Sequence, residues 1–154
     1  MVFELTQVLR GRGVEFLVSP YEADAQLAFL SLSGLVDVVL TEDSDALVYG
    51  CRRVIFKFDK GGHGQEIRRG SLGANQTLSF LNWTDDQFKL MCCVSGCDYA
   101  PKIRSVGLVT AHRLVARHRT LQAVVEALHA AKYEGVDDVY IAQVCVCMSV
   151  CVCL

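Results

Sequence analysis

The stretch VDVVLTEDSDALVY, residues 36–49, decides the fold of this chain. Its first six residues are rich in β-branched side chains, which predicts a buried strand over 36–41. A short helix is expected to follow over 45–49. Asp43 and Asp45 therefore stand just past the carboxyl end of a strand, where open α/β sheets bind their ligands.

A second acidic pair lies upstream, in SPYEADAQLA, residues 19–28. Ser19 is expected to cap a helix, with Glu22 completing an S-x-x-E capping box, and the helix is predicted to end near residue 34. A strand over 14–18 and the end of a helix over 3–9 are predicted before it. Glu22 and Asp24 would then lie in a first helical turn that follows a strand, facing the same crevice as the first acidic pair.

Downstream, the pattern changes from mixed to helical. A strand over 54–58, a loop over 60–64 and a hairpin arm over 65–67 are predicted first. Thr84 and Gln87 form a second capping box that opens a helix reaching about residue 94. A loop over 95–105, a helix over 106–118 and a further helix over 121–132, capped by Thr120, are expected to follow.

Strands alternating with helices predict an α/β fold with a mainly parallel sheet and helices on both faces. We expect three segments: 1–82 in the α/β domain, 83–135 as a helical region, and 136–154 as an atypical apolar tail. The chain has 154 residues, 52% of them hydrophobic, which is enough for one domain with a real core. The net charge of −2 does not mark the whole chain as a polyanion binder.

The cysteines are unevenly distributed. The chain has 8 of them, and four, Cys145, Cys147, Cys151 and Cys153, crowd into the tail. The opening residues do not read as a signal peptide, so thiols in a reducing compartment are expected. The apolar stretch 139–154 falls short of the ~20 residues that span a bilayer. Its Cys-Val alternation is typical neither of a helix face nor of a zinc motif, and a tail that is not the native ending is the alternative to a zinc site.

The chemistry lies in five acids: Glu22, Asp24, Asp43, Asp45, and Asp98 in a Gly-containing loop. Carboxylates that converge repel one another, and Mg²⁺ or Mn²⁺ relieves the repulsion because hard cations prefer oxygen ligands. Taken singly, each acid has a plain structural alternative. Glu22 could be a helix cap, Asp43 and Asp45 a solvated turn, and Asp98 an Asx-turn residue.

Three motifs carry a family resemblance: SPYEADAQLA at 19–28, TEDSD at 41–45 and SGCDY at 95–99. Together they resemble the flap endonuclease and xeroderma-G-type (XPG/Rad2) family of structure-specific nucleases, over about residues 13–132. The resemblance implies a PIN-like (resolvase-like) three-layer fold followed by a helix–two-turn–helix region.

It further implies a Mg²⁺-dependent nuclear DNA repair enzyme with 5′→3′ double-strand exonuclease and 5′-flap endonuclease activity. Its substrates would be duplexes with 5′ ends, nicks or flaps, in mismatch repair and recombination. A monomer with mismatch-repair proteins as partners and no membrane association is expected.

Residue roles follow by position. Glu22 and Asp24 would help to hold one of two Mg²⁺ ions, which Mn²⁺ can replace, and Asp43, Asp45 and Asp98 would serve the other. Residues 95–106 would grip the duplex backbone around a K⁺ ion, with Ser95 and the carbonyls near Lys102 and Val106 as the matching positions.

The chain departs from the family pattern in three places. The family's N-terminal region, which supplies further metal-binding aspartates, has no counterpart here. The Gly-x-Gly of the family's hairpin is Ser105-Val106-Gly107, which would loosen the approach of backbone to phosphate. Beyond about residue 141 the resemblance ends. A catalytically incomplete, DNA-binding fragment is therefore the alternative to an active nuclease.

Residues 99–125 contain no acid, and this segment is the candidate DNA-binding surface. An ordinary solvated helix face is the alternative. His112 and His118 are expected to be surface residues rather than catalytic bases. A nucleotide-binding domain is disfavoured, since Lys60-Gly-Gly-His-Gly is not a phosphate loop. The candidate DNA contacts are Ser95, Lys102, Arg104, Gly107 and Arg113.

Overall fold

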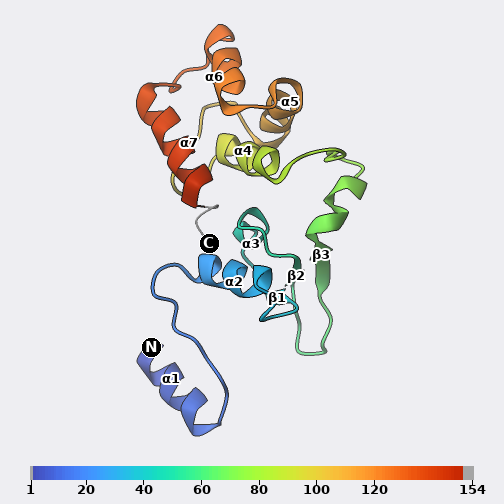
Figure 1. Cartoon of the computed structure of the whole chain (residues 1–154), viewed down its shortest axis with the longest axis vertical. Coiled ribbons are helices and arrows are strands. Elements are labelled where there is room, and N and C mark those ends of the chain that lie inside the picture. Colours follow the sequence, from blue (N-terminus) through green and yellow to red (C-terminus); the bar gives the residue numbers. More distant parts are fainter. Residues whose placement is uncertain (1, 151–154) are drawn as a thin grey trace.

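The computed structural model describes residues 2–150, arranged as an α/β half below a helical half, with helix α1 apart from both (Figure 1). The half that carries the sheet contains α2, α3 and three strands, and the helical half contains α4 to α7. The elements are α1 (Val2–Gly11), α2 (Ala23–Leu32), β1 (Val39–Leu40), α3 (Asp45–Val48), β2 (Arg53–Phe56), β3 (Gln65–Arg68), the 3₁₀ helix η1 (Arg69–Ala74), α4 (Asp85–Ser95), α5 (Leu108–His118), α6 (Leu121–Ala130) and α7 (Asp138–Val150).

The described sheet is small and mixed, with strand order β1-β2-β3. β1 pairs with β2 in parallel through Val39 and Val54, and β3 returns antiparallel to β2 as the predicted hairpin arm. β1 is shorter than the predicted strand over 36–41. The strand predicted over 14–18 is wrong: those residues are irregular, and Leu17 and Val18 are exposed. An apolar run forms a strand only where a neighbouring strand offers its backbone groups, and none does so here.

Each half buries its own core. In the α/β half, Ala28 of α2 packs with Val39, Ala46, Tyr49 and Val54. The helical half has a larger core, centred on α4 and α5. Its fully buried side chains include Met91, Val94, Val106, Val115, Val124, Leu128, Tyr140 and Val144.

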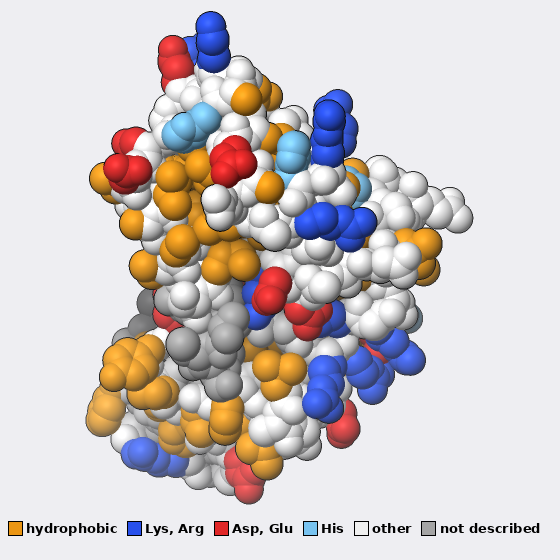
Figure 2. All heavy atoms as spheres, turned by 45° about the horizontal axis from the view of Figure 1, so that its top comes forward, with side chains coloured by type: hydrophobic (Ala, Val, Ile, Leu, Met, Phe, Trp, Pro, Cys, Tyr) orange, Lys and Arg blue, Asp and Glu red, His pale blue; other side chains and the backbone are white. Residues whose placement is uncertain are grey.

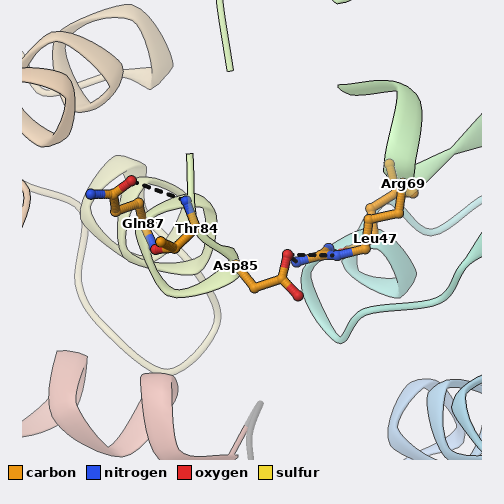
Figure 3. A network of polar contacts seen from close by, with 5 residues as sticks. All are labelled: Leu47, Arg69, Thr84, Asp85 and Gln87. Carbon is orange, nitrogen blue, oxygen red and sulfur yellow. Dashed lines mark hydrogen bonds and ion pairs between the residues drawn. The ribbon is translucent and has the colours of Figure 1, made fainter. Parts of the chain in front are cut away.

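Two helix starts in the helical half match their sequence signals. Thr84 accepts from the backbone of Gln87 while the Gln87 side chain accepts from Thr84, so the predicted capping box is present (Figure 3). Thr120 caps α6 by accepting from the backbone of Ala123. α5 begins at Leu108, two residues later than predicted, with Gly107 as its N-cap.

Helix α7 shows that one prediction was wrong, namely that the apolar tail has no helix face. Tyr140, Val144 and Cys147 recur at i, i+4 and i+7 and are buried in the helical core, on a helix that packs against α4. Nearly every residue of α7 is apolar, so the sequence shows no polar face from which to recognise a helix. Among residues 2–150, no helix combines the length and apolarity needed to cross a bilayer. Cys151 and Cys153 lie outside the described residues.

Arg69 joins the two halves (Figure 3). Its guanidinium donates to the Leu47 carbonyl at the end of α3 and forms an ion pair with Asp85 of α4, with Nη2 and Oδ1 2.9 Å apart. Its guanidinium carbon also lies 5.2 Å from the centre of the Phe88 ring. One side chain from η1 therefore fixes α4 against the half that carries the sheet.

Candidate functional site

Glu22 makes contacts other than those predicted. Helix α2 begins at Ala23 with Glu22 as its N-cap residue, and the Glu22 side chain makes no capping hydrogen bond. The S-x-x-E capping box is therefore wrong. The carboxylate instead accepts hydrogen bonds from two tyrosines, from Tyr49 Oη at 2.8 Å and from Tyr99 Oη. These bonds tie Glu22 to the end of α3 and to the loop after α4.

The two tyrosines are site residues that sequence reasoning missed. Tyr49 is buried at the end of α3, and Tyr99 is half-buried in the loop after α4. Their hydroxyl oxygens lie 3.3 Å apart. Each follows a candidate acid closely in sequence, Tyr49 four residues after Asp45 and Tyr99 directly after Asp98. That adjacency was the available signal.

Electrostatic shifts follow from these bonds. The Tyr99 and Tyr49 hydroxyls, in that order of size, hold the pKa of Glu22 below its ordinary value because they stabilise the carboxylate. Burial, together with the hydrogen bonds to Tyr99 and Glu22, raises the pKa of Tyr49. The hydrogen bond to Glu22 likewise raises the pKa of Tyr99. Both tyrosines are therefore neutral donors near neutral pH.

The four aspartates are electrostatically coupled. Burial raises the pKa of Asp45 first, and the negative charges of Asp43, Asp98, Asp24 and Glu22 raise it further. The pKa of Asp24 is raised by burial, then by Asp43 and Glu22. Acids from α2, from the β1–α3 connection, from α3 and from the loop after α4 thus lie within electrostatic reach of one another, as the sequence analysis expected.

Asp43 also takes part in a local turn, which was the structural alternative to a metal-binding role. Its Oδ1 accepts from the backbone of Asp45 at 2.9 Å, and its own backbone donates to Thr41 Oγ1 at 3.0 Å. Glu22, Asp43 and Asp98 are exposed, whereas Asp24 and Asp45 are half-buried. Within residues 2–150, no three of these carboxylates bring oxygens within 4.8 Å of one another. The acids therefore lie near one another, but among the described residues no three of them form a compact set of ligand oxygens.

A cleft lies between α3 and α4. Asp45, Tyr49, Ser95, Asp98 and Tyr99 contribute to its lining. The Ser95 hydroxyl donates to the Cys92 carbonyl at 2.8 Å. The cleft therefore places two of the candidate acids beside the start of the loop that the resemblance assigns to DNA.

The candidate DNA contacts lie in the loop before α5 and on α5 itself. Lys102, Arg104 and Arg113 are exposed, and the Lys102 stem passes close over Gly96. Ser105 has a φ of 67°, a left-handed conformation that glycine adopts more easily, where the family pattern has glycine. In Figure 2, basic side chains lie mainly along the right of the displayed face, and hydrophobic side chains gather on its left.

His112 is half-buried and packs against neighbouring aromatic side chains. Its ring stacks on Trp83 with centroids 4.7 Å apart, and its Nε2 lies 2.8 Å from the Ser79 carbonyl oxygen. Phe80 meets the same ring edge-on. His112 therefore anchors the segment before α4 onto α5.

Comparison with known sequences identifies close similarity over most of the chain. Residues 13–98 match the family described as the XPG I-region. Exonuclease 1 of Arabidopsis thaliana is 44% identical over 134 residues, which cover 87% of this chain and 18% of that protein. Exonuclease 1 of Danio rerio is 45% identical over 115 residues, covering 75% of this chain and 14% of that protein. The chain thus spans less than a fifth of the length of these relatives.

Solved structures share the fold. The catalytic core of Rad2 in complex with DNA substrate superimposes with a TM-score of 0.72 at 21% identity, covering 85% of this chain and 40% of that one. Flap endonuclease-1 from Methanococcus jannaschii gives 0.70 at 23% identity, covering 93% and 43%. The eukaryotic junction-resolving enzyme GEN-1 binding with potassium gives 0.64 at 20% identity, covering 85% and 36%. The expected PIN-like fold with a following helical region is confirmed.

Proposed function

The chain belongs to the XPG I-region family, and from that premise we propose that it carries metal-binding carboxylates of a structure-specific DNA nuclease. The observation that supports this most directly is the electrostatic coupling of Asp45 to four other acids drawn from separate elements. Unrelated surface acids avoid such coupling, because each raises the cost of ionising the next. A relative named exodeoxyribonuclease 1, from Schizosaccharomyces pombe, and the Rad2 core in complex with DNA substrate support DNA as the substrate.

The donor set fits Mg²⁺. The five acids offer only oxygen ligands, and their mutual repulsion falls when a hard divalent cation enters. Glu22 and Asp24 would help to hold one ion and Asp43, Asp45 and Asp98 a second, with Mn²⁺ able to substitute. When bound, such ions activate water and stabilise the leaving oxygen of a phosphodiester.

The residues of the chain itself would set the site's shape. Tyr49 and Tyr99 hold the Glu22 carboxylate in one orientation, and the Asp43–Asp45 turn fixes the spacing of the second pair. Both tyrosines remain protonated near neutral pH, so they position Glu22 without competing for the cation.

Duplex DNA would lie along the loop before α5 and the first turns of that helix. Lys102, Arg104 and Arg113 would contact phosphates, and Gly107 opens α5 with backbone N–H groups that suit a phosphate. A K⁺ ion held by Ser95 and the carbonyls of Lys102 and Val106 would order this loop. The likeness to a GEN-1 structure described as binding potassium motivates that part of the proposal.

Phosphate contacts position a duplex without reading its sequence, so cleavage would depend on DNA shape. We propose 5′ ends, nicks and 5′ flaps as substrates, and 5′→3′ exonuclease and flap endonuclease chemistry as the reaction. We further propose that the protein acts as a monomer in nuclear mismatch and recombination repair, with mismatch-repair proteins as partners.

The test measures cleavage of a nicked and a 5′-flapped duplex in Mg²⁺, and in chelator as the blank. The purified 154-residue chain is compared with a parent protein of the length of its relatives. Asp43→Asn and Asp98→Asn, made in the parent protein, are expected to lower turnover by at least a thousandfold. Asp37→Asn is the matched control, since Asp37 is exposed and outside the coupled acids.

Full turnover in Asp43→Asn and Asp98→Asn would refute the carboxylate assignment. Salt-sensitive duplex binding by the 154-residue chain without cleavage would favour the DNA-binding fragment instead. In that assay Arg113→Gln is expected to reduce the slope of log affinity against log salt by about 0.9, the loss of one phosphate contact.

A further inference from the structure

Three thiols meet at the junction of α4 and α7, in the cleft that Asp45 and Asp98 also line. Cys93 is on α4, Cys97 follows one turn later in the loop, and Cys147 is on α7. Cys93 Sγ lies 2.9 Å and Cys97 Sγ 3.3 Å from Cys147 Sγ, and all three sulfurs lie within 4.8 Å of one another. Cys93 and Cys147 are buried, and Cys97 is half-buried.

The sulfurs are close enough to share a single ion after a small outward movement. Zinc–thiolate bonds of about 2.3 Å at tetrahedral angles place two sulfurs about 3.8 Å apart, somewhat farther than the Cys147 sulfur lies from the other two. The set contains no carboxylate or imidazole, and an all-sulfur set selects soft or borderline cations over Mg²⁺. The cluster therefore differs from the neighbouring carboxylates in the cations that it prefers.

A second observation concerns Tyr140, which is 1% exposed on the same buried face of α7 as Cys147. Its hydroxyl is buried, and no hydrogen-bond partner for it exists among the described residues. Burial, with smaller contributions from Cys93 and Cys97, raises the pKa of Tyr140 to about 12. An orphaned buried donor costs stability, and a thiolate sulfur nearby would accept its proton in a hydrogen bond.

We propose that Cys93, Cys97 and Cys147 bind one thiophilic d¹⁰ cation, Zn²⁺ in the first instance, as thiolates. Each ligand releases its proton on binding, and the Tyr140 hydroxyl donates to a coordinated sulfur. The ion ties α7 to α4 and to the turn that carries Asp98, the residue after Cys97. Cys147 thus meets one cysteine of α4 and one of the loop that follows it.

The experiment titrates the reduced full chain with Cd²⁺, and separately with Zn²⁺, in excess Mg²⁺ so that the carboxylates hold the harder ion. The expected result is one equivalent bound, a cadmium–thiolate charge-transfer band, and a metal-dependent rise in unfolding temperature. Absence of the band, or binding that Mg²⁺ displaces, would overturn the proposal.

Single substitutions assign the ligands. Cys93→Ser, Cys97→Ser and Cys147→Ser are each expected to lose at least a hundredfold in affinity, whereas Cys145→Ser retains it, since Cys145 is exposed on the same helix. Tyr140→Phe should keep one equivalent and bind less tightly. Equal loss in Cys145→Ser, or unchanged binding in all three ligand variants, would contradict the assignment.

A measurement on the unmutated chain covers the case in which serine variants fail to fold. Alkylation followed by peptide mass spectrometry should show that Cd²⁺ protects Cys97, the half-exposed ligand, and leaves Cys145 reactive. Equal labelling of Cys97 with and without metal would refute the site. So would a Cys93–Cys147 disulfide that persists in reducing buffer, because it would remove two of the three ligands.

Discussion

At the scale of single residues, the site depends on how each acid is satisfied. Glu22 is exposed yet fixed, because two neutral tyrosine hydroxyls occupy its two oxygens. Asp45 is less exposed, and its ionised form is unfavourable because burial and four neighbouring negative charges raise its pKa. The same cluster therefore contains a carboxylate that the fold stabilises and one that it destabilises.

The first residue-scale prediction concerns the hydroxyl that lowers the pKa of Glu22 most. Tyr99→Phe should raise that pKa, Tyr49→Phe should raise it less, and Tyr21→Phe, exposed beside Glu22, should leave it unchanged. Stability from a lowered carboxyl pKa is present above the unfolded value and is lost as pH falls through the folded one. In Tyr99→Phe the loss should therefore be smaller and should be complete at a higher pH. Carboxyl NMR titration measures the shift, and an unmoved Glu22 resonance would contradict the role.

The second prediction concerns Asp45. Because its folded pKa is raised, its ionised form lowers stability above the unfolded pKa, and this cost fades as pH falls through the folded value. Asp45→Asn should therefore raise the unfolding free energy in metal-free neutral buffer, by no more than ~1 kcal/mol after solvent screening. The gain should vanish in Mg²⁺, which relieves the same repulsion. Thermal unfolding with and without Mg²⁺ decides this, and a destabilised variant in both would oppose it.

At the scale of elements, local signals succeed where a cap or a turn is encoded within a few residues. The Thr84–Gln87 box sets the start of α4 by itself, because both partners lie in one turn. The predictions for residues 14–18 and for α7 were wrong in opposite senses. A strand was predicted where none forms, and no helix face was predicted where a packed helix forms. Both outcomes depend on what packs against the segment. Val18 finds no neighbouring strand, whereas Val144 finds a core.

Helix α7 yields the element-scale prediction. Val144→Ala should lower the unfolding free energy by ~2 kcal/mol, because Val144 is fully buried in the helical core and its removal leaves a cavity. Val146→Ala should change it by less than ~0.5 kcal/mol, since Val146 is mostly exposed on the same helix. Chemical denaturation followed at Trp83, the one tryptophan in the sequence, measures both. Equal effects would mean that α7 does not pack as described.

At the scale of the whole molecule, the carboxylate site belongs to neither half alone. Glu22 comes from the half with the sheet, and Tyr99 and Asp98 come from the helical half. The relative placement of the halves therefore sets the distances between the acids. Arg69 is one polar tie that holds this placement, beside the bond from Tyr99 to Glu22.

Arg69→Ala is the prediction at this scale. It removes the bond to the Leu47 carbonyl, the ion pair with Asp85 and the contact with Phe88. The unfolding free energy should fall by ~2 kcal/mol, mostly through the lost hydrogen bond, because the Asp85 carboxylate is exposed. The unfolding transitions seen by Trp83 fluorescence and by circular dichroism should separate as the halves lose their joint. Arg53→Ala is the control, because its ion pair with Glu66 is on the surface. Coincident transitions in Arg69→Ala would assign the joint elsewhere.

The sequence by itself determined the family and the caps of α4 and α6, and it singled out the five acids as candidates. These are encoded in short motifs whose residues act within a turn or at a strand end, as with Asp43 and Asp45. Only the tertiary structure decided that Tyr49 and Tyr99 hold Glu22, that Arg69 joins the halves, and that Cys147 meets Cys93 and Cys97. The physical reason is that each of those contacts joins residues at least 16 positions apart, and no local periodicity records such a distance.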